Sequence, residues 1–329
     1  MLRSATVWSS SAVVFLALGL VSSFLCAATA RAQRAAPSHP ASTETGPAWE
    51  AAPAPPSEAE IKERAGKLVD NQHKDDEALK EFERIERHTD FTAGPNPRPI
   101  EDKLFRIVPT GTGTLRILLK DNGTATDPAE YRRQLEAWHD VLELMLRTDD
   151  PRTKTAYEKY DRRNHQRAQL VDSMLELFAA TWLRRESRDG RLCDVFELKP
   201  KPDFHPHNMM QDALSHIVAT IWVDRATDQM VRGEAHIMRD ISFGGGILGK
   251  VYRGGVFSME QGEVAPGIWE PTKYTYDFEG RKFLFSFDEH QVVDASHYRR
   301  VGPPKEALAI VQDELATNSM PDPPAKPSQ

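Results

Sequence analysis

From residue 181 to residue 301 the chain reads as a succession of short strand-like segments separated by turn residues. Valine, isoleucine, threonine and aromatic residues dominate these segments, and Asp, Gly or Pro stands between them. The Asp189-Gly190 pair predicts a hairpin between 181–186 and 193–198. Consecutive strands without helices between them pair antiparallel, which excludes a βαβ nucleotide-binding fold. The remaining segments are predicted at 217–223, 229–241, 250–261, 268–278, 282–287 and 292–301.

Helical periodicity lies before this run of strands. Ser57 begins a predicted helix, and residues 128–178 repeat apolar side chains at intervals of three and four, interrupted at Pro151. Strands are predicted at 104–108 and 115–119, whereas 82–88 fits either a helix end or a first strand.

These elements predict one α+β domain over residues 57–301 with a helical segment at 128–178. Its centre is a large curved antiparallel sheet of about 9–11 strands, an incomplete barrel covered by helices. Residues 302–329 follow as a short helix and a disordered tail rich in proline.

The N-terminus reads as a secretory signal. A basic start at Arg3 precedes the apolar run 12–21, and Ala30-Arg31-Ala32 has the small-residue form of a cleavage site near Ala32. Residues 1–32 are therefore predicted to be a signal peptide, with an uncleaved anchor as the alternative. Residues 33–56, rich in Ala and Pro, are predicted to be a disordered linker. The protein is then periplasmic or secreted, without a stable membrane span after cleavage, because no later stretch is apolar for long enough.

The charge and the cysteine content of the chain bear on its partners and on disulfide bonding. The net charge of -7 argues against a nucleic-acid partner, which selects for a clustered basic surface. Of the two cysteines, Cys26 leaves with the signal, so the mature chain has no intramolecular disulfide. Cys193 lies in an alternating segment and is predicted to be a buried structural thiol.

The stretch GGGILGKV, Gly244–Val251, approaches a phosphate-binding loop. Gly244, Gly249 and Lys250 have the spacing of G-x-x-x-x-G-K-[ST], but Val251 replaces the metal-binding hydroxyl. A phosphate loop also needs a following helix, and residues 252–259 are strand-like. The glycines are therefore predicted to connect two neighbouring strands, with Lys250 in water.

The sequence contains little that is typical of a catalytic or metal-binding site. His205 and His207 flank Pro206 on a proline-rich connection and could bind a metal only with a third ligand. The chain contains no G-x-S-x-G and no H-E-x-x-H motif. The sequence therefore predicts no enzyme and no cofactor, and a metal-dependent hydrolase is the alternative that uses His205 and His207.

The informative feature is an apolar, aromatic sheet face. Alternation places Tyr274, Tyr276 and Phe278 on one side of a strand, and Phe283, Phe285 and Phe287 on one side of the next. The face is either ordinary core covered by the helices at 128–178, or the wall of a dry cavity for acyl chains. Alternation also means that the candidates cannot all line one surface. The candidate residues for the cavity wall are Trp222, Phe257, Met259, Trp269, Tyr274, Tyr276, Phe283 and Phe285.

Three segments carry a family resemblance. Ile221–Met230 (IWVDRATDQM) resembles the tryptophan–apolar–aspartate–turn segment of the outer-membrane lipoprotein carrier and sorting superfamily. Gly262–Thr272 (GEVAPGIWEPT) resembles a later segment of such proteins, and Ser296–Arg300 resembles their final edge strand. A family of uncharacterised secreted bacterial proteins with this architecture is similar at 188–191, 198–202 and 241–246.

The resemblance implies an incomplete antiparallel barrel wrapped over helices that binds lipid, or the acyl groups of a lipoprotein, without covalent chemistry. The alternative is an envelope scaffold or stress sensor whose core is filled by its own side chains and which binds another envelope protein. One fold can serve many functions, so the function of this protein depends on the residues of its site.

Overall fold

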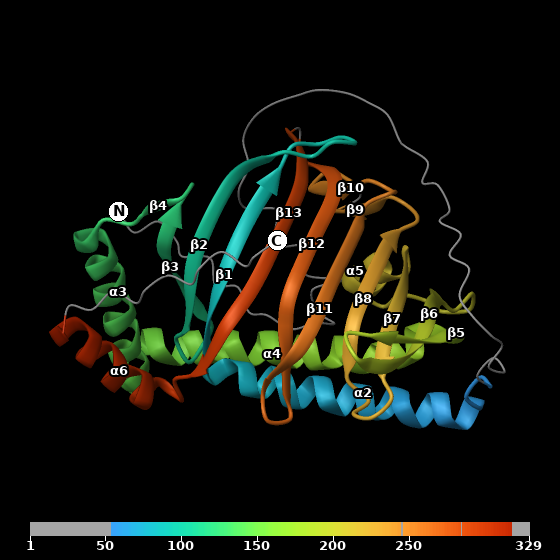
Figure 1. The fold of residues 1–329 in the computed structure, drawn as a ribbon, viewed down its shortest axis with the longest axis horizontal. Coiled ribbons are helices and arrows are strands. Elements are labelled where there is room, and N and C mark those ends of the chain that lie inside the picture. The colour runs from blue at the N-terminus through green and yellow to red at the C-terminus, as the bar shows by residue number, and fades with distance from the viewer. Residues whose placement is uncertain (1–53, 245, 284, 318–329) are drawn as a thin grey trace.

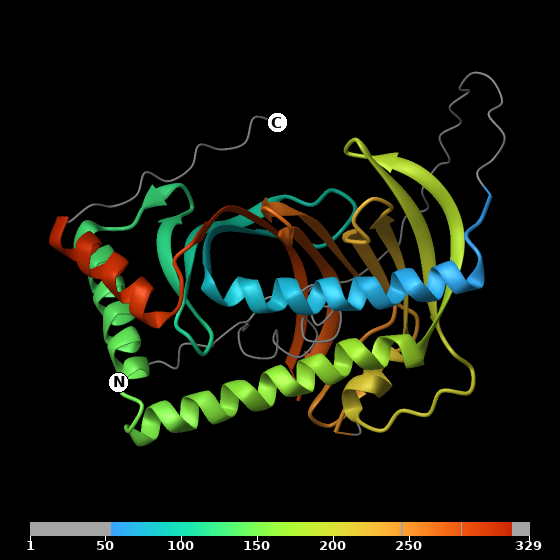
Figure 2. The same cartoon turned by 90° about the horizontal axis from the view of Figure 1, so that it is seen from below.

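The structure is a computed structural model that describes residues 54–244, 246–283 and 285–317. The predicted signal peptide, most of the predicted linker and the end of the tail lie outside the described residues. The described chain forms five α-helices and a 13-stranded antiparallel sheet that is not closed into a barrel (Figure 1). The α+β prediction with a large curved sheet is therefore confirmed, and Figure 2 shows the curvature from below.

Eleven strands follow one path, β4-β3-β2-β1-β13-β12-β11-β8-β7-β6-β5, and β10 joins β9 to β12. Two neighbour pairs are far apart in sequence: β1 pairs with β13, and β8 with β11. The strands are β1 Phe82–Phe91, β2 Pro99–Pro109, β3 Thr114–Asp121, β4 Thr124–Ala125, β5 Phe178–Arg188, β6 Arg191–Pro200, β7 Ile217–Asp224, β8 Met230–Ile237, β9 Ile241–Phe243, β10 Gly249–Val251, β11 Val256–Ala265, β12 Ile268–Lys282 and β13 Phe285–Arg300.

The helices begin where the sequence supplies caps. Ser57 caps α2 in a reciprocal capping box with Glu60, as predicted. Asp127 and Asp150 cap α3 and α4, each followed by a proline in the first turn, so Pro151 starts α4, while α3 already ends at Leu146. The helices are α2 Glu58–Ala78, α3 Pro128–Leu146, α4 Pro151–Leu177, α5 Met209–Leu214 and α6 Pro304–Thr317. No helix in the described part of the chain is both long and apolar enough to cross a bilayer.

Several predicted boundaries were wrong, and glycine and turn geometry explain them. Residues 82–88 form a strand, which resolves the ambiguity at that point. The predicted strand 250–261 divides into β10 and β11 around Gly254, which has φ of +92°. The predicted strands 282–287 and 292–301 are one strand, β13, and Lys282 instead ends β12. Likewise, 229–241 divides into β8 and β9, and α5 interrupts the connection that was predicted to be irregular.

The GGGILGKV stretch is a hairpin, as predicted. β9 and β10 pair antiparallel, and the intervening Gly244 and Gly246 have positive φ of +57° and +83°. A Cβ on Gly244 would stand 2.6 Å from Cγ of Leu248, so the turn needs glycine there. Lys250 is not simply in water, because its ammonium lies 2.8 Å from the Asp240 carboxylate.

Two apolar cores lie on the helical side of the sheet. The larger core packs the C-terminal half of α4 and part of α2 against β6 to β13. The smaller core packs α3 and α6 against β2 and β3, because the stripe Tyr131, Leu135, Trp138 and Leu142 of α3 meets Val108, Ile117 and Leu119. The expectation that the whole segment 128–178 covers one apolar face is therefore wrong for α3.

The smaller core surrounds one buried cation. The Arg106 guanidinium is 2% exposed and donates to Glu83 on β1, to Glu314 on α6 and to the Tyr131 hydroxyl on α3. Its Nη2 lies 2.6 Å from Glu83 Oε2, and its guanidinium lies over the Trp138 ring at 5.2 Å. One residue thus joins two strands and two helices.

Replacing Arg106 by Ala should destabilise the fold by about 3–5 kcal/mol, because Glu83 then remains buried without its main partner. Urea denaturation followed by circular dichroism measures the change. The control is Arg147→Ala, whose exposed side chain pairs with Glu143 one turn away and should change stability by less than about 0.5 kcal/mol. Equal, small effects of the two substitutions would show that the Arg106 network does not hold these elements together.

Candidate ligand-binding face

The larger core contains a continuous series of aromatic rings, here called the aromatic ladder: Phe257, Tyr274, Tyr276, Phe278 and Phe287. It spans β11, β12 and β13, whose alternating side chains point to the helical side at these positions. Ring centroids are 5.2 Å apart for Phe257 and Tyr276, 6.4 Å for Tyr276 and Phe278, and 6.3 Å for Phe278 and Phe287. These separations are those of favourable aromatic pairs.

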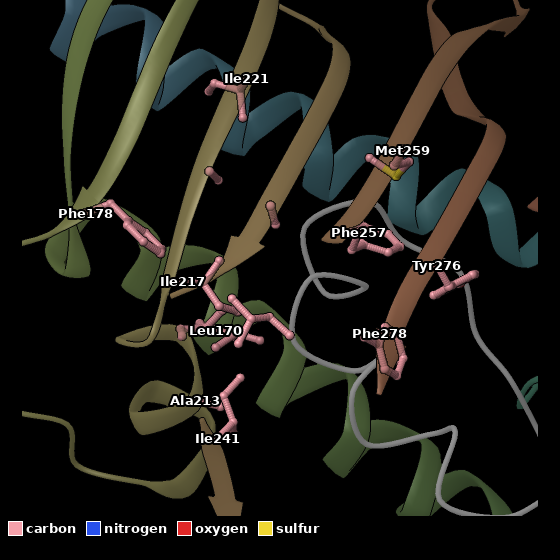
Figure 3. Packing of buried hydrophobic residues seen from close by; sticks show 14 of the residues in the cluster. Leu170, Phe178, Ala213, Ile217, Ile221, Ile241, Phe257, Met259, Tyr276 and Phe278 are labelled. Atoms are coloured by element: carbon pink, nitrogen blue, oxygen red, sulfur yellow. The ribbon is translucent and has the colours of Figure 1, made fainter. Parts of the chain in front are cut away.

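Four of the eight predicted wall residues meet in this core. Phe257, Met259, Tyr274 and Tyr276 are all buried in the same cluster, with exposed fractions between 1% and 8%. Figure 3 shows Met259, Phe257 and Tyr276 on the strands, with Leu170 among the side chains opposite. Burial raises the pKa of both tyrosines above their ordinary value, so the hydroxyls remain protonated at neutral pH.

The other predicted wall residues lie elsewhere. Trp222 and Trp269 belong to a separate buried cluster with Cys193, Val195 and Val231. Guanidinium groups cover these two rings: Arg191 stands 4.4 Å from the Trp269 centroid, and Arg188 and Arg232 stand within 6 Å of Trp222. The two tryptophans therefore do not share a surface with the aromatic ladder.

Phe283 and Phe285 are outside both clusters, and half or more of each side chain is exposed. The prediction that Phe283, Phe285 and Phe287 lie on one side of a strand was wrong. Phe283 occupies the turn between β12 and β13 with φ of +53°, so strand alternation does not apply to it. Only Phe287 of the three packs against the larger core.

The histidine and cysteine candidates have plain structural explanations. His205 and His207 are exposed on the connection before α5. Within the described ranges, no three His, Cys, Asp or Glu side chains are grouped so that they could hold a metal ion. Cys193 is fully buried, and burial raises the pKa of its thiol to about 11, which keeps it an inert neutral group at physiological pH.

Helix α2 covers the aromatic side mainly through polar contacts along its length. Arg64 pairs with Asp194 on β6 and with Asp228 in the β7–β8 turn. Further along, Asn71 donates to the Thr227 carbonyl at 3.0 Å, and Lys74 donates to the Gly267 carbonyl at 2.7 Å. Its apolar contribution to the larger core is three partly buried side chains, Ile61, Leu68 and Val69.

A buried polar cluster lies where the C-terminal end of α2 meets the sheet, and the sequence analysis did not predict it. Asp75 of α2 accepts hydrogen bonds from the Trp269 backbone amide and from Gln229, both at 3.0 Å. Glu270 is 2% exposed, and its Oε1 accepts no hydrogen bond from the described residues. Burial raises the pKa of Glu270 well above its usual range, because the charged carboxylate is disfavoured away from water.

A small cavity of about 30 Å³ adjoins this cluster between α2, α4 and β1. Its polar lining includes Asp76, Lys80, Arg84, Asn164 and Arg167. The volume is enough for one or two water molecules. The sequence does contain charged residues on both sides of the junction between α2 and β1, at positions 75, 76, 84 and 86. Periodicity along the chain does not show that these side chains come together in space.

Comparison with known proteins gives fold-level neighbours only. No protein-family model matches the sequence, and no curated protein matches it. Among solved structures, an outer membrane lipoprotein-sorting protein domain from Vibrio parahaemolyticus covers 75% of this chain and 99% of its own at 9% identity, with a TM-score of 0.32.

Two further solved structures are similar over comparable shares of the chain. A DUF1329 family protein from Desulfovibrio piger covers 73% of this chain and 92% of its own at 13% identity and a TM-score of 0.28. A LolA superfamily protein from Nitrosomonas europaea covers 75% of this chain and 96% of its own at 12% identity and a TM-score of 0.26. The structural neighbours thus include the lipoprotein-sorting superfamily that the sequence resembles.

Asp76 should make stability depend on pH. Burial raises its pKa from 3.8 to about 6, while Arg167 and Gln72 oppose the rise. Between these values the unfolded chain releases this proton before the folded chain does, so the contribution of Asp76 to stability falls as pH rises from about 4 to about 6. The full loss is at most roughly 3 kcal/mol.

The Asp76→Asn substitution should remove this dependence. The free energy of unfolding of the variant minus that of the unchanged protein should increase as pH rises from 4 to 7, because only the unchanged protein loses the Asp76 contribution. Loss of the Arg167 contact in the variant lowers this difference but does not reverse its trend with pH. Chemical denaturation at four pH values measures it, and Asp161→Asn, an exposed site on α4, is the control. A pH-independent difference for Asp76→Asn would contradict the assignment.

Proposed function

We propose that this protein is a periplasmic or secreted binding protein that holds an apolar ligand between the sheet and its helices. The ligand class is a lipid or the acyl chain of a lipoprotein, and binding involves no covalent chemistry. The aromatic ladder is the observation that carries the proposal, because five rings form one apolar surface over three adjacent strands. The predicted signal peptide supports the compartment.

The manner in which α2 is attached supports the proposal. The fully buried side chains of α2 are polar, Gln72 and Asp75, and its pairs with Asp194 and Asp228 can be replaced by water. An intramolecular hydrogen bond of this kind contributes about 1 kcal/mol net. An acyl chain that buries about ten methylenes gains roughly 8 kcal/mol, enough to offset several such contacts. In this proposal α2 is the element that a ligand displaces.

The second candidate is an envelope scaffold or sensor that binds another protein. One observation favours it: Phe257, Met259, Tyr274 and Tyr276 are already buried by side chains of the same chain. A core filled in this way needs no ligand. The two candidates differ in whether the sheet and helices separate under working conditions.

Weakening the contacts between α2 and the sheet should distinguish the two candidate functions. Arg64→Ala removes two ion pairs between α2 and the sheet, while Asp194 keeps Arg185 and Trp182 as partners, so the fold should survive. If α2 must move for a ligand to enter, the apparent Kd for a fluorescent fatty acid should fall about tenfold, which corresponds to about 1.4 kcal/mol. Fluorescence titration gives the Kd, and native mass spectrometry identifies any co-purifying lipid.

The matched control is Glu63→Ala, on an exposed position of the same helix, whose ion pair with Lys67 lies within α2. Its Kd should equal that of the unchanged protein. Absence of fatty-acid or lipopeptide binding by both the unchanged protein and Arg64→Ala, with a stoichiometric protein partner in a pull-down, would exclude the first candidate and favour the second.

A further inference from the structure

Two turns at one end of the sheet expose a group of large apolar side chains, here called the apolar tip: Ile247, Leu248, Phe283 and Phe285. Ile247 and Leu248 belong to the β9–β10 turn, and the two phenylalanines flank the β12–β13 turn. Gly249 pairs with Lys282, and the Phe283 amide donates to the Leu248 carbonyl at 3.2 Å, so the two turns lie side by side. Exposed fractions are 76% for Ile247 and Phe285 and about half for the other two.

Stability does not account for the tip. Phe283 adopts φ of +53°, a left-handed conformation that a bulky residue adopts only with strain. Its side chain is half exposed, so packing compensates for little of that strain. An aromatic residue in a strained, exposed turn is the pattern of a functional contact, because a glycine or asparagine would occupy the same turn more easily.

The charge around the tip has the opposite sign to that of the whole chain. In the segments 238–253 and 281–287 the cations are Arg239, Lys250, Arg253, Arg281 and Lys282. The acid of those segments is Asp240, which pairs with Lys250, and Glu279 and Asp288 flank the second segment, so the cations still outnumber the acids. The whole chain carries -7. Arg281 donates to the Gly246 carbonyl at 3.0 Å, which places its guanidinium beside the tip.

The tip lies at the opposite end of the strands from the two long helices. Figure 1 places β9 and β10 at the upper ends of β12 and β13, and α2 and α4 at the lower ends. The last rings of the aromatic ladder, Phe278 and Phe287, stand a few residues behind the tip on the same two strands. The exposed apolar surface is therefore close to the end of the buried one.

We propose that the apolar tip docks on the surface of an anionic lipid bilayer. Exposed aromatic and aliphatic side chains rimmed by Lys and Arg suit the boundary between acyl chains and negatively charged headgroups. Each cation near such a surface strengthens binding about fivefold at moderate salt. The positive charge of the tip segments, in a chain of net charge -7, complements the negative surface of an anionic membrane. The inference rests on the exposed tip and not on the proposed ligand.

Vesicle flotation tests the proposal on the chain as processed and secreted by the expressing cell. Vesicles of phosphatidylglycerol and phosphatidylethanolamine should carry the protein to the top of the gradient, and phosphatidylcholine vesicles should carry at least fivefold less. Salt at 0.5 M should reduce binding to the anionic vesicles, because it shortens the Debye length to about 4 Å. The double substitution Phe283→Asn and Phe285→Ser should lower the bound fraction at least tenfold. Its melting temperature should be equal or higher, since Asn tolerates positive φ.

The matched control replaces two exposed leucines at the other edge of the sheet, Leu183→Ser with Leu192→Ser, and should bind like the unchanged protein. Lys282→Gln with Arg253→Gln should lower binding severalfold and flatten its dependence on salt. Equal flotation of the tip variant and the control would overturn the proposal. So would failure of the unchanged protein to bind anionic vesicles, or a dimer that the tip substitutions dissociate, which would make the tip an interface between two copies. Because flotation needs no bound ligand, these outcomes do not depend on the fatty-acid titration.

Discussion

The register of β12 is the constraint on which the rest of this structure depends. β12 pairs with β11 on one side and with β13 on the other, and β10 pairs with its upper end. Successive side chains alternate, so one register places Tyr274, Tyr276 and Phe278 together under the helices. A slip of one residue would turn all three rings to the other side of the sheet and bring Lys273, Thr275 and Asp277 into the core. The burial of the rings therefore fixes the pairing, and the pairing in turn positions both ends of the strand.

The two sides of the sheet use charge differently. On the helical side, ionic groups hold elements together: Arg106 joins β1, β2, α3 and α6, and Arg64 joins α2 to β6. In the other cluster, Arg188, Arg191 and Arg232 lie over the faces of Trp222 and Trp269. Buried ion pairs contribute little net stability compared with apolar packing, but removing one partner is expensive. Such contacts therefore specify where α2 and α6 sit more than they strengthen the fold.

Local sequence signals predicted the elements better than their continuity. The Ser57 cap and the Asp-Gly hairpin are local signals, and both were correct because capping and turn geometry depend on a few adjacent residues. The division at Gly254 and the fusion into one β13 depend on pairing with distant strands, which propensity does not contain. The placement of Phe283 failed for the same reason: alternation was extended across a turn.

The sequence also predicted part of the grouping of the candidate wall residues. Phe257, Met259, Tyr274 and Tyr276 come together because they lie in phase on paired strands. Alternation assigns Trp222 to the side opposite Ile221 and Trp269 to the side opposite Tyr274, and both tryptophans lie together in the separate cluster. The candidate list combined residues from both sides. The polar cluster of Asp75 and Glu270 escaped prediction because Asp75 reaches the sheet at the Trp269 amide, 194 positions away, a contact that exists only once α2 lies across the sheet.

The two ends of β12 differ, because polar contacts cover the lower end and exposed apolar side chains lie at the upper end. An apolar ligand would therefore reach the core more easily from the upper end. At the lower end, polar contacts hold α2 to the strand: Lys74 donates to the Gly267 carbonyl, and Asp75 accepts from the Trp269 amide. Water can replace such contacts one at a time. At the upper end, exposed phenylalanines stand beside the buried Phe278 and the partly buried Phe287, so an acyl chain leaving a membrane would pass from one apolar surface to the next with little exposure to water. Entry at the tip would separate the sheet from its helices progressively, and α2, whose buried side chains are polar, would yield before α4, which contributes Leu170, Val171 and Leu177 to the core.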